Sequence, residues 1–393
     1  MYLDFTAAQK TLRQEIRDYY RTLFTPELRR AYDAERLQMG GPVFRQIVAQ
    51  LGADRWLGLG WPEEYGGRNM TALEQFIFWD ETWRARAPLP VISVNTIGPT
   101  IMQFGSAAQK QDLLPKILRG ELFFGVGYTE PEAGTDLASL STRAELDGDH
   151  WVINGSKVFT THAHDADYIW LAARTDPRAA KHKGISIFLV PTDAEGFSCT
   201  PIYTVGYERT NATYYDNVRI PKQNLVGELN AGWRLLTSQL NHERIALATP
   251  GPADRVLDEV WSWAAKLTGP DGRAMIEQPW VQHNLARVRA RLEALKVLNW
   301  RSAWSLTNGT PRMEEASAVK VFGSEFFVEC YRLLLEIVGR SGTQLTGEPG
   351  CLFDGLLEHA YRSATTLTFG GGVNEVQRDI IATVGLSLPR SRR

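Results

Sequence analysis

The spacing of apolar residues changes twice along this chain of 393 residues. Apolar residues follow helical spacing from Thr6 to Phe24, and similar patterns continue to about residue 120. From about residue 123 to about residue 230, short runs of β-branched and aromatic residues end at turn residues, as β-strands do. Helical spacing then returns, and one apolar stripe runs from Trp280 to Trp300. This order of helices, strands and helices predicts an α+β fold.

The two changes divide the chain into three expected domains. An N-terminal α-helical domain should occupy residues 1–122, a middle β-domain residues 123–230, and a C-terminal α-helical bundle residues 231–393. In the first domain, Thr6 is the expected N-cap of a helix that ends before Thr25-Pro26. The strands expected in the β-domain include Tyr168 to Ala173, Gly184 to Val190 and Ala212 to Ile220.

Charge and cysteine content exclude several classes of protein. The formal net charge is -2 without any basic or acidic block, so nucleic acids and anionic membranes are not expected as partners. Cys199, Cys330 and Cys351 are odd in number and too widely spaced for a disulfide framework or a zinc site. There is no secretory signal pattern, and no apolar run approaches the roughly 20 residues of a membrane span. We therefore expect a cytoplasmic protein.

One segment of the expected β-domain is suited to holding a flat, anionic cofactor. Gly127–Asp136 reads Gly-Tyr-Thr-Glu-Pro-Glu-Ala-Gly-Thr-Asp. The hydroxyls of Thr129 and Thr135 can bond to heteroatoms of a ring, and Gly134 lacks a Cβ, so the backbone there can approach the ring. Taken alone, the segment also fits an ordinary Pro/Gly loop with a helix cap.

A second segment follows about 30 residues further on. Asn154-Gly155 separates Trp151-Val-Ile153 from Lys157-Val-Phe-Thr-Thr161, and this dipeptide between two apolar runs predicts a β-hairpin turn. Because side chains alternate along a strand, Phe159 and Thr161 should share one face of the second strand.

Together the two segments resemble the flavin-binding signature of the acyl-CoA dehydrogenase family, over about residues 6 to 388. The resemblance implies that family's fold: an N-terminal helical domain, a middle β-barrel domain and a C-terminal four-helix bundle. It also implies FAD, held by Tyr128, Thr129, Gly134, Thr135, Phe159 and Thr161. The family usually has Trp at the position of Phe159, and Phe can stack on the ring but lacks the indole N–H.

The resemblance also implies a reaction. Members of the family remove two hydrogens from adjacent carbons of an acyl-CoA thioester: a carboxylate takes the α-proton, and the β-hydrogen leaves as hydride to the flavin. Hydrogen bonds to the thioester carbonyl and a raised pKa of the carboxylate make this possible. In most members the carboxylate lies in a loop before the last helix, and the matching position here is Gly371, within Thr368 to Arg378. Glu375, four residues further on, is a poor substitute because it falls inside the helix.

A minority of the family carries the base in a Leu-x-x-Glu-Arg pattern on a different helix. Leu240-Asn-His-Glu-Arg244 matches this pattern, which implies Glu243 as the catalytic base and Arg244 as its structural neighbour. The alternative is a surface Glu–Arg pair on a helix. His162-Ala-His164-Asp165 lacks a third ligand, so we assign no metal.

Two segments differ from the pattern of homotetrameric members, in which a neighbouring subunit completes the flavin site. The expected Arg-to-Phe spacing is missing near Thr268 to Met275, and Glu336 and Arg340 replace a neutral amide and a small residue. An unpaired Glu336 would oppose cofactor binding in a homotetramer. The chain thus resembles the subunits of α2β2 acyl-CoA dehydrogenases of actinobacterial steroid breakdown. The partners implied are a bulky, steroid-derived acyl-CoA, a paralogous subunit and an electron-transfer flavoprotein.

Two other functions fit the same fold. One is a flavin-dependent monooxygenase or oxidase, whose members commonly lack a carboxylate in the position of Glu243. The other is a non-catalytic subunit that stabilises an active partner, which Gly371 and Glu336 would suit.

Overall fold

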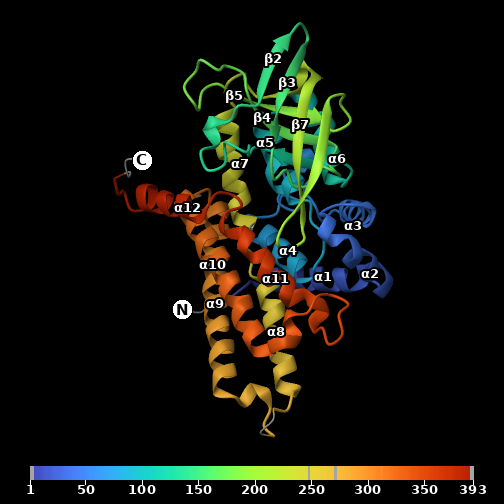
Figure 1. The fold of residues 1–393 in the computed structure, drawn as a ribbon, viewed down its shortest axis with the longest axis vertical. Helices are drawn as coiled ribbons and strands as arrows, with labels where there is room; N and C mark the ends of the chain where they lie inside the picture. The colour runs from blue at the N-terminus through green and yellow to red at the C-terminus, as the bar shows by residue number, and fades with distance from the viewer. Residues whose placement is uncertain (1–3, 247, 270–271, 311, 390–393) are drawn as a thin grey trace. The chain divides into compact units, whose positions relative to one another are not determined.

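The computed structural model of the chain describes residues 4–246, 248–269, 272–310 and 312–389, and of residues 240–246 it describes the backbone only. The described residues form two compact units. The sheet unit comprises Phe24–Met70 and Pro88–Glu243, and the bundle unit comprises the described parts of Met1–Leu23, Thr71–Ala87 and Arg244–Arg393. Strands followed by long helices confirm the predicted α+β fold (Figure 1).

The sheet unit is built on one mixed sheet of eight strands, in the order β6-β7-β3-β2-β4-β5-β8, with β1 parallel to β4. Its strands are β1 (Phe124–Gly127), β2 (Arg143–Asp147), β3 (His150–Lys157), β4 (Tyr168–Arg174), β5 (Ile185–Pro191), β6 (Phe197–Tyr203), β7 (Arg209–Pro221) and β8 (Leu225–Val226). The three strands expected from the sequence are confirmed as β4, β5 and most of β7. Apolar side chains of β3, β4 and β5 form a buried core in this unit, among them Ile153, Leu171 and Phe188.

Helices belonging to the sheet unit are α2 (Pro26–Glu35), α3 (Pro42–Ala53), α5 (Gly98–Phe104), α6 (Ala107–Leu118) and the greater part of α7 (Gly232–Ala246). The Thr25 hydroxyl accepts from the Leu28 amide at 3.2 Å, and Pro26 occupies the first turn of α2. Between α3 and α5, the Trp61 ring is 2% exposed and its Nε1 donates to the Val94 carbonyl at 3.0 Å. The loop at Trp61 therefore packs on its own core.

The hairpin prediction at Asn154-Gly155 is wrong. The hairpin that joins β2 to β3 lies earlier in the sequence, at Gly148-Asp149, where Asp147 pairs with His150. Asn154-Gly155 lies inside β3, at a shift of register against β7 between Ile153 and Gly155. Both sites use a glycine with positive φ, 61° at Gly148 and 147° at Gly155, and such glycines occur in bulges as well as in turns. Cross-strand pairing decided between them.

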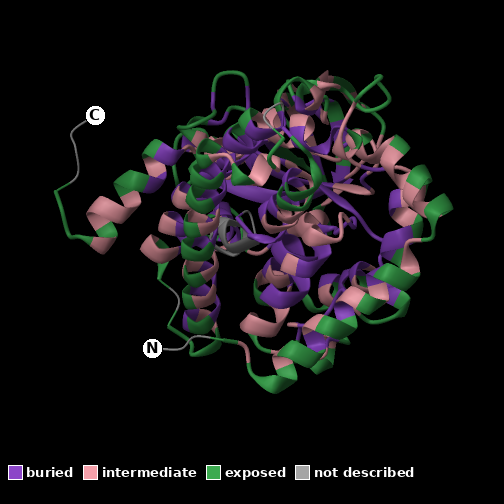
Figure 2. Cartoon of the chain, turned by 90° about the horizontal axis from the view of Figure 1, so that it is seen from below, coloured by how far each residue is buried: buried purple, intermediate pink, exposed green. Residues whose placement is uncertain are grey.

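The bundle unit contains long helices around an apolar core. Its helices are α1 (Ala7–Leu23), α4 (Ala72–Arg84), α8 (Gly251–Lys266), α9 (Pro279–Thr307), α10 (Met313–Val338), α11 (Leu356–Ala364) and α12 (Asn374–Ile380). The predicted stripe of α9 is buried at Leu285, Val288, Leu292 and Leu295, and partly buried at Leu298. Figure 2 shows buried and exposed faces on single helices, as amphipathic packing requires.

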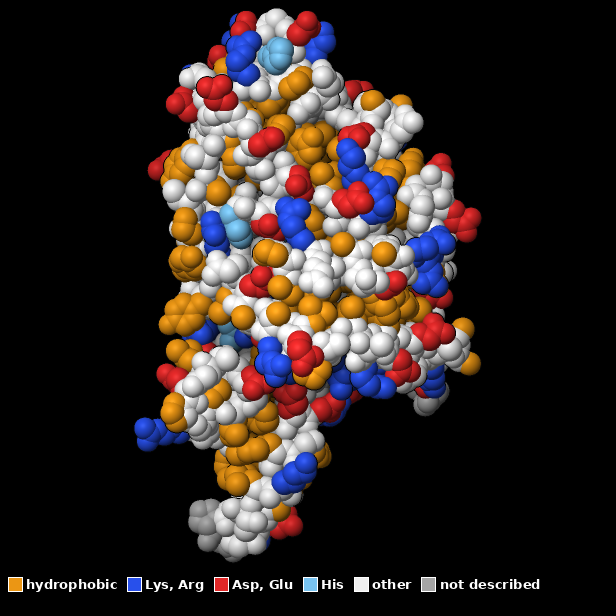
Figure 3. Space-filling view, turned by 90° about the vertical axis from the view of Figure 1, so that its right-hand side faces the viewer, with side chains coloured by type: hydrophobic (Ala, Val, Ile, Leu, Met, Phe, Trp, Pro, Cys, Tyr) orange, Lys and Arg blue, Asp and Glu red, His pale blue; other side chains and the backbone are white. Residues whose placement is uncertain are grey.

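The predicted cap of the first helix is also confirmed. The Gln9 amide donates to the Thr6 hydroxyl at 3.3 Å, and the Thr6 amide donates to the Gln9 side chain at 3.0 Å. None of the helices in the described residues is long and apolar enough to cross a membrane. Basic and acidic side chains are interspersed on the face drawn in Figure 3.

Candidate functional site

The two predicted cofactor segments lie side by side, next to strands β1 and β3. The first continues from the end of β1, and the second continues from Lys157, the last residue of β3. The Val158 amide donates to the Thr129 carbonyl at 2.8 Å, so a backbone hydrogen bond links the two segments directly. Residues about 30 positions apart in the sequence thus become neighbours.

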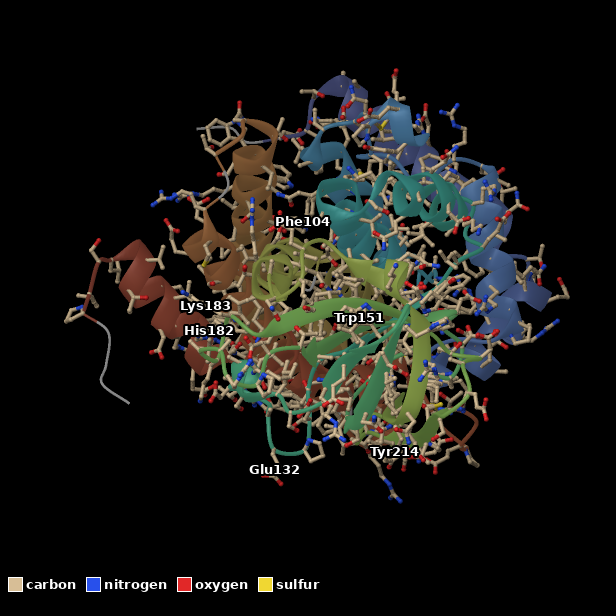
Figure 4. All side chains as sticks on the ribbon, turned by 90° about the horizontal axis from the view of Figure 1, so that it is seen from above. Phe104, Glu132, Trp151, His182, Lys183 and Tyr214 are labelled. Carbon is tan, nitrogen blue, oxygen red and sulfur yellow. The ribbon has the colours of Figure 1, made fainter. Side chains whose placement is uncertain are left out.

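The first segment holds its central residues at the surface. Glu130 and Ala133 exchange backbone hydrogen bonds of 3.0 and 3.1 Å, which close a turn around Pro131. Figure 4 shows Glu132 at the tip of a loop that projects from the sheet. Gly134 and Thr135, which follow the turn, are exposed, and Thr129 is half-buried.

The space beside Gly134 is open. A Cβ built on Gly134 would meet no described atom within 4 Å, so a ring can approach this backbone from the open side. The exposed hydroxyl of Thr135 stands beside it. The residues present therefore fit the predicted role of the segment.

Tyr128 differs from the rest of the first segment because its side chain is buried. Its ring is 8% exposed, its hydroxyl donates to Gln239 Oε1, and Trp170 Nε1 donates to the hydroxyl at 2.9 Å. The side chain therefore links β4 to α7 inside the sheet unit.

The second segment does not form the predicted strand. β3 ends at Lys157, and Phe159 adopts a left-handed backbone with φ of 59°. The amide of Thr160 bonds to the Asn211 carbonyl at 2.8 Å, while that of Val158 turns away to Thr129. The expectation that Phe159 and Thr161 share a strand face is wrong, because the backbone partners change at each step and the chain leaves the sheet.

Phe159 nevertheless has the exposure that a stacking residue needs. Its ring is 62% exposed, and a left-handed backbone is uncommon for an aromatic residue, so the surrounding contacts must maintain it. Thr161 lies further inside, with its hydroxyl 3.4 Å from that of Thr210.

A buried ion pair beneath the two segments was not predicted. Lys157 is 0% exposed and Glu130 is 4% exposed, and Lys157 Nζ lies 2.8 Å from Glu130 Oε1. Burial alone would raise the pKa of Glu130, but the adjacent ammonium and the amide donors lower it to about 2. The sequence did carry a signal, since Lys157 continues the inward alternation of Trp151 and Ile153, where a charge requires a partner.

The helix expected to carry the base is present as α7, and it includes Glu243. The side chains of Glu243, its neighbour Arg244 and His242 lie outside the described residues. The base assignment therefore stays a prediction.

The loop within Thr368 to Arg378 matches the one that carries the base in most members of the family described above, and in this chain it contains glycines with positive φ. Gly371 has φ of 67° and Gly372 has φ of 95°. Lys320, which is 1% exposed on α10, donates to the carbonyls of Thr368 and Gly372 at 3.1 and 2.7 Å and to Asn374 Oδ1 at 2.7 Å. Within the bundle unit, this ammonium fixes both ends of the glycine loop.

Two further sequence features have structural roles. Arg45 Nε donates to Asp165 Oδ1 at 3.0 Å, and burial lowers the pKa of His162 to about 4. In the bundle unit, Glu336 forms an ion pair with Arg332 and accepts from Asn284 Nδ2 at 3.1 Å. The expectation that Glu336 is unpaired is therefore wrong, because Arg332, one helical turn away, neutralises its charge.

Comparison with known proteins gives matches along nearly the whole chain. Family models of the acyl-CoA dehydrogenase N-terminal, middle and C-terminal domains match residues 6–121, 125–218 and 230–386. Acyl-CoA dehydrogenase FadE26 of Mycobacterium tuberculosis (strain ATCC 25618 / H37Rv) is 50% identical over 400 residues, and FadE29 of the same strain is 47% identical over 394 residues. Each alignment covers 100% of both chains.

Solved structures match equally far. A chain of the ChsE4-ChsE5 complex from Mycobacterium tuberculosis has a TM-score of 0.94 and 50% identity. A chain of the Tcur3481-Tcur3483 steroid ACAD has a TM-score of 0.93 and 49% identity. Both comparisons cover 100% of this chain and 100% of the other.

Proposed function

The chain belongs to the acyl-CoA dehydrogenase family, and from that premise we propose that it is a FAD-dependent subunit acting on a bulky, steroid-derived acyl-CoA in the cytoplasm. The observation that carries the cofactor assignment is the junction of the two segments. There, the open space beside Gly134 lies on one segment and the exposed Phe159 on the other, and the hydrogen bond from the Val158 amide to the Thr129 carbonyl links the two segments.

Five residues of this junction would hold FAD through side chains or backbone: Thr129, Gly134, Thr135, Phe159 and Thr161. Tyr128 would support the first segment from inside, because its side chain is buried against Gln239 and Trp170. Bound there, FAD would supply the acceptor for the substrate's hydride. The protein would supply orientation and a fixed polar surrounding.

Glu243 would take the α-proton of the substrate. The supporting observations are the absence of any carboxylate at Gly371, the ammonium-bound glycine loop around it, and the Leu-x-x-Glu-Arg pattern on α7. Glu243→Gln keeps the size of the side chain and removes its basicity, so dehydrogenation should fall by at least about a hundredfold with FAD content unchanged.

The Glu243→Gln experiment has a clear opposite result. If the variant retains more than about a tenth of the wild-type rate, the assigned base is wrong, since loss of a positioned base costs far more. Glu375→Gln is the matched control: Glu375 is exposed in the first turn of α12, so this variant should keep the wild-type rate.

A bulky substrate is supported by one structural neighbour, the Tcur3481-Tcur3483 assembly, which is a steroid ACAD. A glycine at position 371 also removes a side chain from the loop. We expect a higher kcat/KM for a steroid side-chain CoA thioester than for octanoyl-CoA. The reverse order would refute the substrate class and leave the reaction intact.

The assembly we propose is an α2β2 heterotetramer with a paralogous subunit, which passes electrons to an electron-transfer flavoprotein. Two structural neighbours are complexes of two named chains. This chain also lacks the Arg-to-Phe segment that homotetrameric members present to a neighbour. Coexpression with the paralogue should yield an active assembly with about two flavins, whereas a fully active homotetramer with four would refute it.

A further inference from the structure

We propose that Glu130 and Lys157 are positioning residues that hold the two cofactor-facing segments in one fixed arrangement. This inference rests on the proposed function, because it assigns the pair a role in binding FAD. Neither side chain would touch the cofactor, since both are buried beneath the surface on which Gly134 and Phe159 are exposed.

The position of Lys157 in the chain makes it suited to this role. It is the last residue of β3, so its backbone leads directly into the second segment. Its Nζ donates to the Tyr128 carbonyl at 3.0 Å and to Glu130 Oε1 at 2.8 Å, the residues on either side of Thr129. One ammonium therefore brackets Thr129 near the start of the first segment, next to the backbone bond from Val158 to Thr129.

Glu130 extends the same network past the end of the first segment, to Ser141 and Thr142. Its Oε2 accepts from the Ser141 amide at 2.7 Å and from the Ser141 hydroxyl at 2.8 Å, and its Oε1 also accepts from the Thr142 amide at 2.9 Å. Since Thr142 leads into β2, the carboxylate joins the start of the segment to the strand that follows it. The residues between these anchors include the exposed Gly134 and Thr135.

A second cation supports this arrangement. Arg174 at the end of β4 donates to the Ala138 carbonyl at 2.6 Å. The turn of the first segment is thus tied at both sides, while its apex faces solvent. Preorganised anchors of this kind reduce the ordering that a ligand must impose when it binds.

Stability alone does not account for the ion pair. Apolar residues of similar volume often replace a buried ion pair without loss of stability, because removing both charges also removes their desolvation cost. What apolar residues cannot reproduce is the directed set of hydrogen bonds to Tyr128, Ser141 and Thr142. The two roles predict different results when both charges are removed together.

The test compares Lys157→Met, Glu130→Gln and the double variant Lys157→Met/Glu130→Leu with the wild type. Each is prepared in its native assembly, stripped of FAD and titrated with FAD at a temperature where circular dichroism shows it fully folded. We expect the dissociation constant for FAD to rise at least about tenfold in Lys157→Met, the lower end of the loss that follows removal of an outer partner at a metal site. The double variant should fold and still bind FAD weakly.

Val218→Ala is the matched control, because Val218 is 0% exposed in the core of the same sheet and makes none of these bonds. It should lower the unfolding midpoint without changing the dissociation constant for FAD. If Lys157→Met does not fold, the double variant decides. Wild-type FAD affinity in the double variant overturns the inference while the proposed function stands, whereas a wild-type assembly that takes up no FAD refutes both.

Discussion

Replacing Lys320 by Met should lower the free energy of unfolding of the bundle unit by about 3 kcal/mol. The Lys320 side chain is 1% exposed and donates to Thr368 O, Gly372 O and Asn374 Oδ1. Met fills much of the same volume but donates to none of them. Each buried acceptor that loses its donor costs about 1–3 kcal/mol, and the sum is reduced because the exposed neighbour Phe369 shows that water can reach one end of the loop.

Urea unfolding checks this value, with the free energy of unfolding extrapolated to water at an unchanged slope. Lys266→Met is the control, because Lys266 is exposed at the end of α8 in the same unit, and this change should stay within about 0.5 kcal/mol. Hydrogen exchange should also quicken in residues 368–374. A loss below about 1 kcal/mol for Lys320→Met would show that the loop does not depend on the ammonium.

Three further predictions concern stability. Burial raises the pKa of Asp80 from 3.8 to about 7, so the folded state should lose stability as pH rises through this range. Asn at this position can still accept from the Gly251 amide, so Asp80→Asn should stabilise the protein by about 1–2 kcal/mol at pH 8 but not at pH 4. Glu130 has a folded pKa of about 2 and an ordinary value of 4.5, so its contribution of about 3 kcal/mol is present above pH 4.5 and lost as pH falls toward 2; Glu130→Gln should flatten that part of the unfolding curve. Gly155→Ala would place a Cβ 2.5 Å from Thr142 Oγ1 and should cost more than about 2 kcal/mol, whereas Gly148→Ala, where no described atom lies within 4 Å of the new Cβ, should cost about 1 kcal/mol; equal losses in denaturant would contradict this.

Sequence reasoning was sufficient wherever a structure depends on neighbours within one helical turn or on the alternation of one strand. Thr6 caps α1 through Gln9, three residues away, and the apolar stripe of α9 lies on one face because the helical period places it there. The strands β4 and β5 appear where apolar runs end at turn residues. Local stereochemistry alone determines these features.

Tertiary contacts decided what local patterns left open. Asn154-Gly155 and Gly148-Asp149 are both competent turns, and only pairing of β3 with β2 and β7 selected one of them. Phe159 leaves the expected strand because the Val158 amide has a partner at Thr129, 29 positions earlier in the sequence. Glu336 is neutralised by Arg332 and accepts a hydrogen bond from Asn284, and a comparison of motif positions shows neither partner.

The candidate site divides in the same way. Sequence alone indicated the cofactor residues, because turn chemistry and a family signature are written in consecutive residues: Tyr128, Thr129, Gly134, Thr135, Phe159 and Thr161. The pair of Glu130 and Lys157 became visible only in the folded chain, because the free energy of a buried charge depends on a partner brought to 2.8 Å by the sheet. A sequence specifies which charges a chain contains, and the tertiary structure decides which of them lose their water and which residues neutralise them.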